Sequence, residues 1–138
     1  MAPTIVTPAN PSELRRALVI KRPGLQRTVI VHSWACSSRR STDHDFTVHV
    51  VPGASLDIIV RSGLPFLKLL HGEVTVTFQS SWGNSLELGY GTRATVKVNN
   101  PNVKVTLTGD RRGLTLLASK DENRENRVRD FTKNPQRA

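Results

Sequence analysis

Apolar and polar residues alternate through most of the segment from Val51 to Leu117, and this period of two constrains the fold more than any other feature of the chain. Successive side chains of a β-strand point to opposite faces, so the alternation is typical of strands with one face buried and the other in water. The runs are short and leave no room for crossover helices, which predicts antiparallel strands joined by hairpins. Residues that favour turns separate the runs at Pro52-Gly53, Ser62-Gly63, Trp82-Gly83-Asn84 and Asn99-Asn100-Pro101.

The strand expected first has apolar residues on both faces, with Val29 and Val31 on one side and Ile30 and Trp34 on the other. Such a strand is typical of the middle of a sheet or of an interface between subunits. We find no internal repeat in the sequence. The pattern predicts strands at Gln26–Cys36, Phe46–Val51, Ala54–Val60, Phe66–Leu70, Glu73–Phe78, Leu86–Leu88, Thr92–Val98, Val103–Thr108 and Leu114–Ser119.

The two ends of the chain differ from this β-rich middle. Residues 1–25 are expected to form an N-terminal arm with one short helix, for which Ser12 is the predicted N-cap and Pro23-Gly24 the stop; an extended arm is the alternative. Residues 120–138 are mostly charged or amide side chains, and burying them cannot offset the entropy lost on ordering. We therefore predict a mobile polar tail, with a few helical turns over 122–131 as an alternative.

The net charge of +9 and the sequence pI of about 10.8 favour partners that carry many negative charges, such as nucleic acid. A charge that only keeps the protein in solution is the alternative. Aromatic residues make up 5% of the chain, which argues against a base-stacking platform and for contacts to phosphate. The candidate polyanion-binding residues are four basic pairs at expected loop tips and at the N-terminal arm: Arg15 and Arg16, Lys21 and Arg22, Arg39 and Arg40, Arg111 and Arg112.

Cysteine content and hydropathy bear on the compartment. Cys36 is the single cysteine, so no internal disulfide can form, and this favours a reducing, intracellular location in cytoplasm or nucleus. The first residues lack the basic start and apolar core of a secretory signal. No apolar run approaches the roughly 18 residues of a membrane helix, so no membrane partner is expected.

The spacing of the glycines, together with the short strands, resembles that of a known protein family. Gly53 and Gly72 are separated as the two glycines of the first cupin motif are, and LLHGEVTVTF (Leu69–Phe78) is similar to the end of that motif. The stretch from Leu86 to Val103 is similar to the second motif. Over Phe46–Ala118 the chain thus resembles the cupin superfamily, which implies an all-β fold: a single antiparallel jelly-roll barrel over residues 26–119.

The resemblance does not extend to the metal ligands of that family. Ile59 and Arg61 stand at the positions of its first two histidines, Pro65 or Phe66 at its glutamate and Asn102 at its last histidine. These residues do not suit a transition metal. We therefore expect no metal, no other cofactor and no catalytic residue.

Two function hypotheses follow from this degenerate motif. The first is a non-enzymatic assembly module, similar to the dimerising cupin domains of centromere proteins, that forms a homodimer and binds nucleic acid or another polyanion in a viral or chromatin setting. The second is a metal-free cupin, similar to small nucleoside phosphorylases, that binds a phosphorylated ligand or nucleoside inside the barrel. The expected pocket residues are Arg61, Arg93, Asn102 and Ile59, because a guanidinium buried in the barrel would need an anionic partner. A one-residue shift in register would instead place Arg61 in solvent.

Overall fold

The computed structural model describes residues 4–31, 45–61, 66–79, 83–98, 103–118, 128–130 and 132–133. They form one short helix and a series of strands, and every strand pair is parallel. In chain order the elements are β1 (Thr4–Val6), α1 (Pro11–Ala17), β2 (Val19–Ile20), β3 (Gln26–Val31), β4 (Asp45–Val50), β5 (Ser55–Val60), β6 (Phe66–Phe78), β7 (Gly83–Leu88), β8 (Thr92–Val98), β9 (Lys104–Gly109), β10 (Leu114–Ala118) and β11 (Val128–Asp130).

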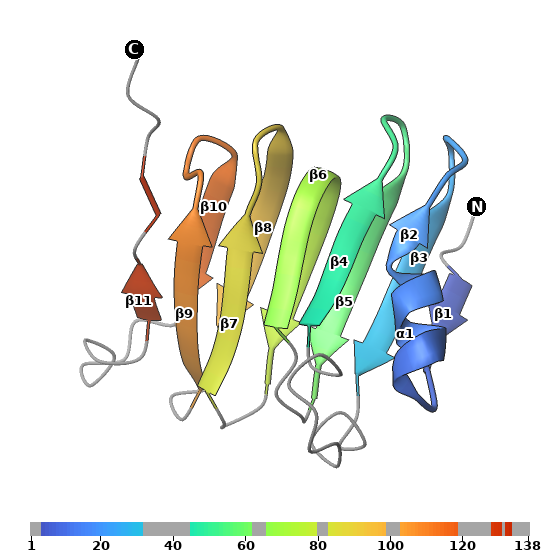
Figure 1. Ribbon diagram of the computed structural model, residues 1–138, viewed down its shortest axis with the longest axis horizontal. Helices are drawn as coiled ribbons and strands as arrows, with labels where there is room; N and C mark the ends of the chain where they lie inside the picture. Colours follow the sequence, from blue (N-terminus) through green and yellow to red (C-terminus); the bar gives the residue numbers. More distant parts are fainter. Residues whose placement is uncertain are drawn as a thin grey trace.

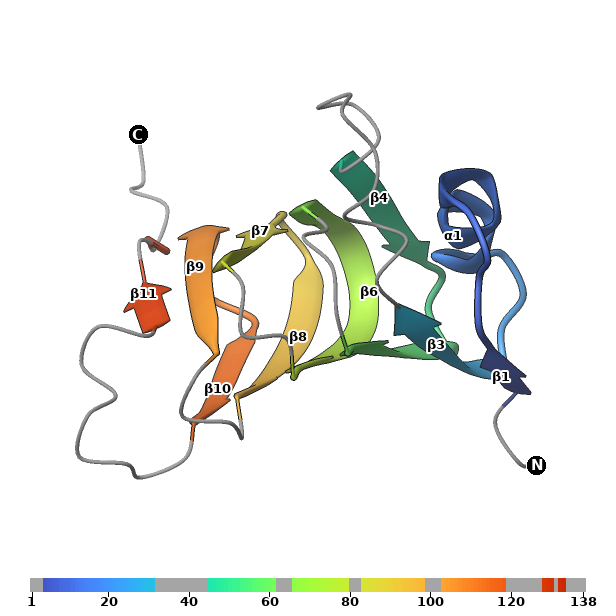
Figure 2. The ribbon, with the colours of Figure 1, turned by 90° about the horizontal axis from the view of Figure 1, so that it is seen from below.

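The strands wind into a β-solenoid of about four turns. Each coil places one strand in a first sheet and the next strand in a second sheet, and the sheets face each other across the core (Figures 1 and 2). The first sheet runs β2, β4, the first half of β6, β7, β9 and β11. The second sheet runs β1, β3, β5, the second half of β6, β8 and β10.

This architecture overturns the expected antiparallel jelly roll, and with it the cupin resemblance and the β-barrel. The strand positions predicted between Gln26 and Ser119 are nearly right, whereas β1, β2 and β11 were not predicted, and consecutive strands do not form hairpins. At each tight turn the chain passes from one sheet to the other, so a strand pairs with its equivalent in the next coil. Alternation is the same in both arrangements, because in each the inner side chains face a core and the outer ones face solvent.

The coil length explains the glycine spacing that suggested a cupin motif. Gly53, Gly72 and Gly91 recur every 19 residues, and each has a positive φ at the same corner of its coil. In the second sheet Leu56 pairs with Val74, and Val74 with Ala94, so the register advances by 18 and then 20 residues. The statement that the sequence holds no repeat was therefore wrong, since one coil of about 20 residues is the structural unit.

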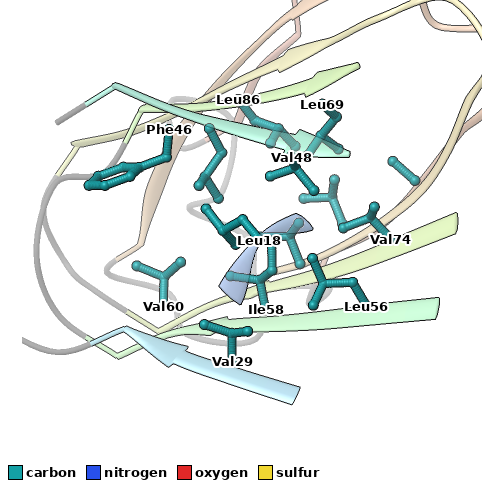
Figure 3. Close-up of a cluster of buried hydrophobic side chains, with 14 of the residues drawn as sticks. Leu18, Val29, Phe46, Val48, Leu56, Ile58, Val60, Leu69, Val74 and Leu86 are labelled. Atoms are coloured by element: carbon teal, nitrogen blue, oxygen red, sulfur yellow. The ribbon is translucent and has the colours of Figure 1, made fainter. Parts of the chain in front are cut away.

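The core is a column of aliphatic side chains between the two sheets. Figure 3 shows Phe46, Val48 and Leu86 from the first sheet facing Val29 and Ile58 from the second. All of these side chains are at most 1% exposed. Since like residues stack on like residues from coil to coil, the coils bury their apolar faces against one another as well as across the core.

Helix α1 closes the N-terminal end of this column. Its N-cap is Asn10, whose side chain accepts a hydrogen bond from the backbone N–H of Glu13 at 2.9 Å, so the prediction of Ser12 was wrong by two residues. Leu14 and Leu18 point into the core. The guanidinium of Arg27 donates to the carbonyls of Ala17 and Val19, at 2.9 and 3.1 Å, and so joins the end of the helix to β3.

Two further expectations can be compared with the structure. β3 lies between β1 and β5 inside the second sheet, as predicted for a central strand, and the residues predicted to extend it, 32–36, lie outside the described residues. Part of the expected tail, Val128–Asp130, forms β11 beside β9.

In the described part of the chain, no helix has the length and apolar character needed to cross a membrane.

Candidate functional site

The tight turns of the solenoid stack on one another along one long edge, which is the upper edge in Figure 1. We call this surface the turn edge. Neighbouring strands of a sheet lie about 4.8 Å apart, so side chains at equivalent places in successive turns lie close together. The turn edge consists of residues 21–25, 51–54, 71–72, 89–91 and 110–113.

Backbone hydrogen bonds join these turns to their neighbours. The N–H of Gly24 donates to the carbonyl of Gly53 at 2.8 Å, and the N–H of Asp110 donates to Leu88 at 2.8 Å. The buried hydroxyl of Thr92 donates to the carbonyl of Leu69 at 3.2 Å, one coil away. The turn edge is thus fixed by the sheet hydrogen bonding, and side chains on it start from a rigid backbone.

A hollow of about 360 Å³ lies over the last two turns of the turn edge. We call it the Tyr90 hollow. A second hollow, of about 310 Å³, adjoins it over the turns at 51–54 and 71–72, and Gly91 and Arg93 line both. The Tyr90 hollow is lined by Gly89, Tyr90, Gly91, Thr92, Arg93, Asp110, Arg112 and Gly113.

Tyr90 and Arg112 form a fixed pair at the mouth of the hollow. The Arg112 guanidinium lies 4.6 Å from the centre of the Tyr90 ring, a cation–π contact. Asp110 holds the guanidinium in place by accepting from Nε and from a terminal nitrogen, at 3.1 and 2.7 Å. This bonding lowers the pKa of Asp110 and raises the pKa of Arg112, so both groups stay ionised and neutralise each other.

Three further cations surround this neutral pair, and all three are exposed. Arg93 lines both hollows, and its guanidinium forms no salt bridge with another described residue. Lys133 lies beside Asp110 in an isolated bridge, and its N–H donates to the carbonyl of Gly109 at 2.9 Å. The N–H of Arg111 in turn donates to the carbonyl of Lys133 at 3.3 Å. Arg93 and Lys133 therefore add positive charge beside the neutral pair of Asp110 and Arg112.

The predicted basic residues are only partly brought together. Arg111 and Arg112 lie at one end of the turn edge, and Lys21 and Arg22 lie at the other. Arg15 and Arg16 project from α1, where the Arg15 guanidinium lies 5.2 Å from the ring centre of Phe46. The predicted pair of Arg39 and Arg40 lies outside the described residues.

The ligand pocket was predicted inside a barrel, but the described strands form a solenoid. Arg61 is exposed just after the end of β5, whereas Arg93 is exposed at the start of β8. Because β5 and β8 belong to one parallel sheet, these two side chains lie at opposite ends of their strands. Ile59 is half-buried on the outer face of β5, and Asn102 lies outside the described residues.

Tyr90 and Lys133 were missed by the sequence reasoning. The Gly-Tyr-Gly motif at 89–91 gave a usable signal for Tyr90, because an aromatic residue between two glycines in a turn has little around it to bury its ring. No sequence signal points to Lys133, whose place depends on the chain returning beside β9.

Two of the described histidines lie close together on neighbouring strands. The rings of His49 and His71 meet edge to face, with their centres 4.0 Å apart, because the register between β4 and β6 skips Leu70 of β6 and so sets His49 beside His71. Among the residues that the structure describes, no three of His, Cys, Asp and Glu gather where they could hold a metal ion.

Comparisons of the chain with protein-family models, with curated proteins and with solved structures give no match, so the site must be interpreted from its own geometry.

Proposed function

We propose that the protein is a non-enzymatic binding module that holds a polyanion along its turn edge. The observation that supports this best is the group of exposed cations at the C-terminal end of the edge, where Arg93, Arg111 and Lys133 surround the neutral pair of Asp110 and Arg112. The whole chain adds a long-range attraction through its net charge of +9.

The shape of the edge suits a linear ligand. Lys21 and Arg22 extend the positive charge to the first turn, so cations occur at both ends of one straight row of turns. A chain of regularly spaced phosphates or sulfates laid along this row would meet cations at both ends of it and release its counterions. A single small anion would use only a few of them.

The proposal is tested by removing two turn-edge cations and comparing the result with an equal loss of charge elsewhere. The double variant R93Q/K133Q removes exposed cations beside the Tyr90 hollow, and R16Q/R61Q removes exposed cations from α1 and from the opposite ends of the strands. Binding of a heparin fragment and of a DNA duplex is measured by titration over a range of salt concentrations. For DNA, we expect R93Q/K133Q to lower the slope of log K against log salt by roughly 2, because each lost phosphate contact lowers it by about 1.

The matched control separates a site from a diffuse charge effect. We expect R16Q/R61Q to weaken binding slightly and to leave the slope nearly unchanged. Equal losses in the two double variants would show that only net charge matters, and the absence of any salt-dependent binding by the wild-type chain would rule the proposal out.

We propose separately that the protein forms a homodimer. The sequence suggested that the strand beginning at Gln26 forms the interface between subunits, but the structure favours another place. The second sheet covers β3 on both sides with strands of the same chain, so β3 needs no partner subunit. The residues that favour a homodimer are instead Leu116 and Leu117 on β10, the last strand of the second sheet, which are 36% and 49% exposed.

A further inference from the structure

Tyr90 is unusual among the aromatic residues that the structure describes. Its side chain is 77% exposed, and no other Phe, Trp or Tyr in the described part of the chain is among the exposed large hydrophobic side chains. A phenol ring left in water gives up the free energy that burial would supply. Its position at the tip of a rigid turn therefore calls for a role outside the core.

The contacts of Tyr90 hold its ring ready for a ligand. Arg112 lies against the ring. The Asp110 carboxylate accepts hydrogen bonds from the main-chain N–H of Arg112, at 3.0 Å, and from its guanidinium. Because the Asp110 carboxylate neutralises the charge of Arg112, this arginine serves mainly to orient the ring. The pair thus presents an aromatic surface whose geometry is set before binding.

The charges around the ring indicate what kind of ligand would suit it. Arg93 lines the same hollow as Tyr90, and Arg111 and Lys133 lie in and beside the next turn. Proteins that bind single-stranded nucleic acid combine these features, an aromatic ring on which a base stacks and cations that follow the phosphates. A duplex keeps its bases stacked on one another, and a sulfated polysaccharide has no aromatic base.

We propose that the Tyr90 hollow binds one unpaired nucleotide of a single-stranded nucleic acid, with the base stacked on Tyr90 and the phosphate beside Arg93. This rests on the proposed polyanion function and names its ligand class. It also revises the expectation from aromatic content, because one exposed ring beside cations suffices for one stacked base.

The test uses the full chain and a fluorescent oligo(dT) of about 12 nucleotides, with anisotropy as the readout. We expect Y90A to bind it about 5- to 150-fold more weakly than wild type, and Y90F to bind like wild type, because stacking needs the ring and not the hydroxyl. An oligonucleotide of the same length without bases keeps the phosphates, so its affinity should be the same for Y90A and wild type. Folding is checked by circular dichroism, and the exposure of Tyr90 makes it a safe position to change.

A direct measurement is available because Tyr90 is the single tyrosine of the chain. Labelling tyrosine rings with ¹³C gives one set of ring signals, which a stacked base should shift upfield. The shift should appear with oligo(dT) and be absent with the baseless oligonucleotide and with heparin.

The outcomes separate this inference from the proposed function. If Y90A binds oligo(dT) as tightly as wild type does, and R93Q/K133Q still binds it more weakly, stacking is refuted and the polyanion function stands. If neither variant changes binding, both proposals fail. Equal affinity of the wild-type chain for oligo(dT) and for the baseless oligonucleotide would also overturn the stacking site.

Discussion

At the scale of single residues, Asp57 is the side chain least suited to its surroundings. It lies on the outer face of β5 between Thr28 and Thr75, and one carboxylate oxygen is buried without a hydrogen-bond partner in the described structure. Burial raises the pKa of Asp57, and the positive charge of Lys97 offsets part of that rise. The folded state therefore binds this proton more tightly than the unfolded chain does.

The sign of the pH effect follows from this raised pKa. The stability that Asp57 contributes is fully present below its ordinary pKa of 3.8 and is lost as the pH rises through the higher pKa of the folded state. D57N should therefore stabilise the protein at pH 7, by less than about 1 kcal/mol because the side chain is partly solvated. Urea unfolding at pH 7 should show this gain, and at pH 3 the gain should vanish.

Asp110 supplies a control, because its pKa is shifted in the opposite direction from that of Asp57. The hydrogen bonds from Arg112 lower its pKa, so its contribution to stability is present above the ordinary carboxyl pKa and is lost as the pH falls through the lowered one. D110N should destabilise the protein at pH 7 and have no effect at the lowest pH. A destabilising D57N at pH 7 would contradict the assigned cause.

At the scale of elements, the corner of β6 is one of the tight points of the solenoid. Gly72 has a φ of +111°, and a Cβ at this position would overlap the carbonyl oxygen and the side chain of Val50 in the preceding coil. G72A should thus cost about 2–4 kcal/mol, from backbone strain and overlap together. Chemical denaturation followed by circular dichroism measures this loss.

Gly24 is the matched control for the corner. It has a similar positive φ of +83°, but a Cβ there would have nothing within 4 Å. G24A should cost only the backbone strain, about 1–2 kcal/mol. Equal losses in the two variants would mean that contact with the neighbouring coil contributes nothing at Gly72.

At the scale of the whole molecule, the two ends of the solenoid differ. Helix α1 covers the N-terminal end with its polar side outward, through Ser12, Glu13, Arg15 and Arg16. At the C-terminal end, β10 is the last strand of the second sheet, and its outward Leu117 is half-exposed. Any association between copies is therefore expected at the C-terminal end.

Two substitutions at opposite ends test where copies of the chain meet. We expect the wild-type chain to form dimers at micromolar concentration, and L117K to shift them to monomers by placing a charge on the contact. I5K, at a side chain that is 66% exposed on β1, should leave the dimer intact. Sedimentation velocity distinguishes the species, and a wild-type chain that stays monomeric would refute the homodimer proposal.

Much of the local structure was predictable from the sequence. The strand expected at Thr92–Val98 is β8 itself, and its alternating residues Ala94, Val96 and Val98 are buried. The hollow was less predictable. Arg93 was predicted to line a barrel pocket and Arg111 to bind a polyanion. Their closeness to Tyr90 and Lys133 depends on the stacking of coils that are about 20 residues apart.

For the middle of the chain, the sequence by itself determined most strand positions and which of their side chains face the core, because these depend on neighbours two or three residues away. It did not predict the strands β1, β2 and β11, which lie in the expected N-terminal arm and tail. Only the tertiary structure decided which strands pair. A Pro-Gly turn such as Pro52-Gly53 can close a hairpin or lead into the opposite sheet, and the alternation of Leu56, Ile58 and Val60 buries the same side chains in either case. The parallel solenoid follows from hydrogen bonds between successive coils, which no local pattern specifies.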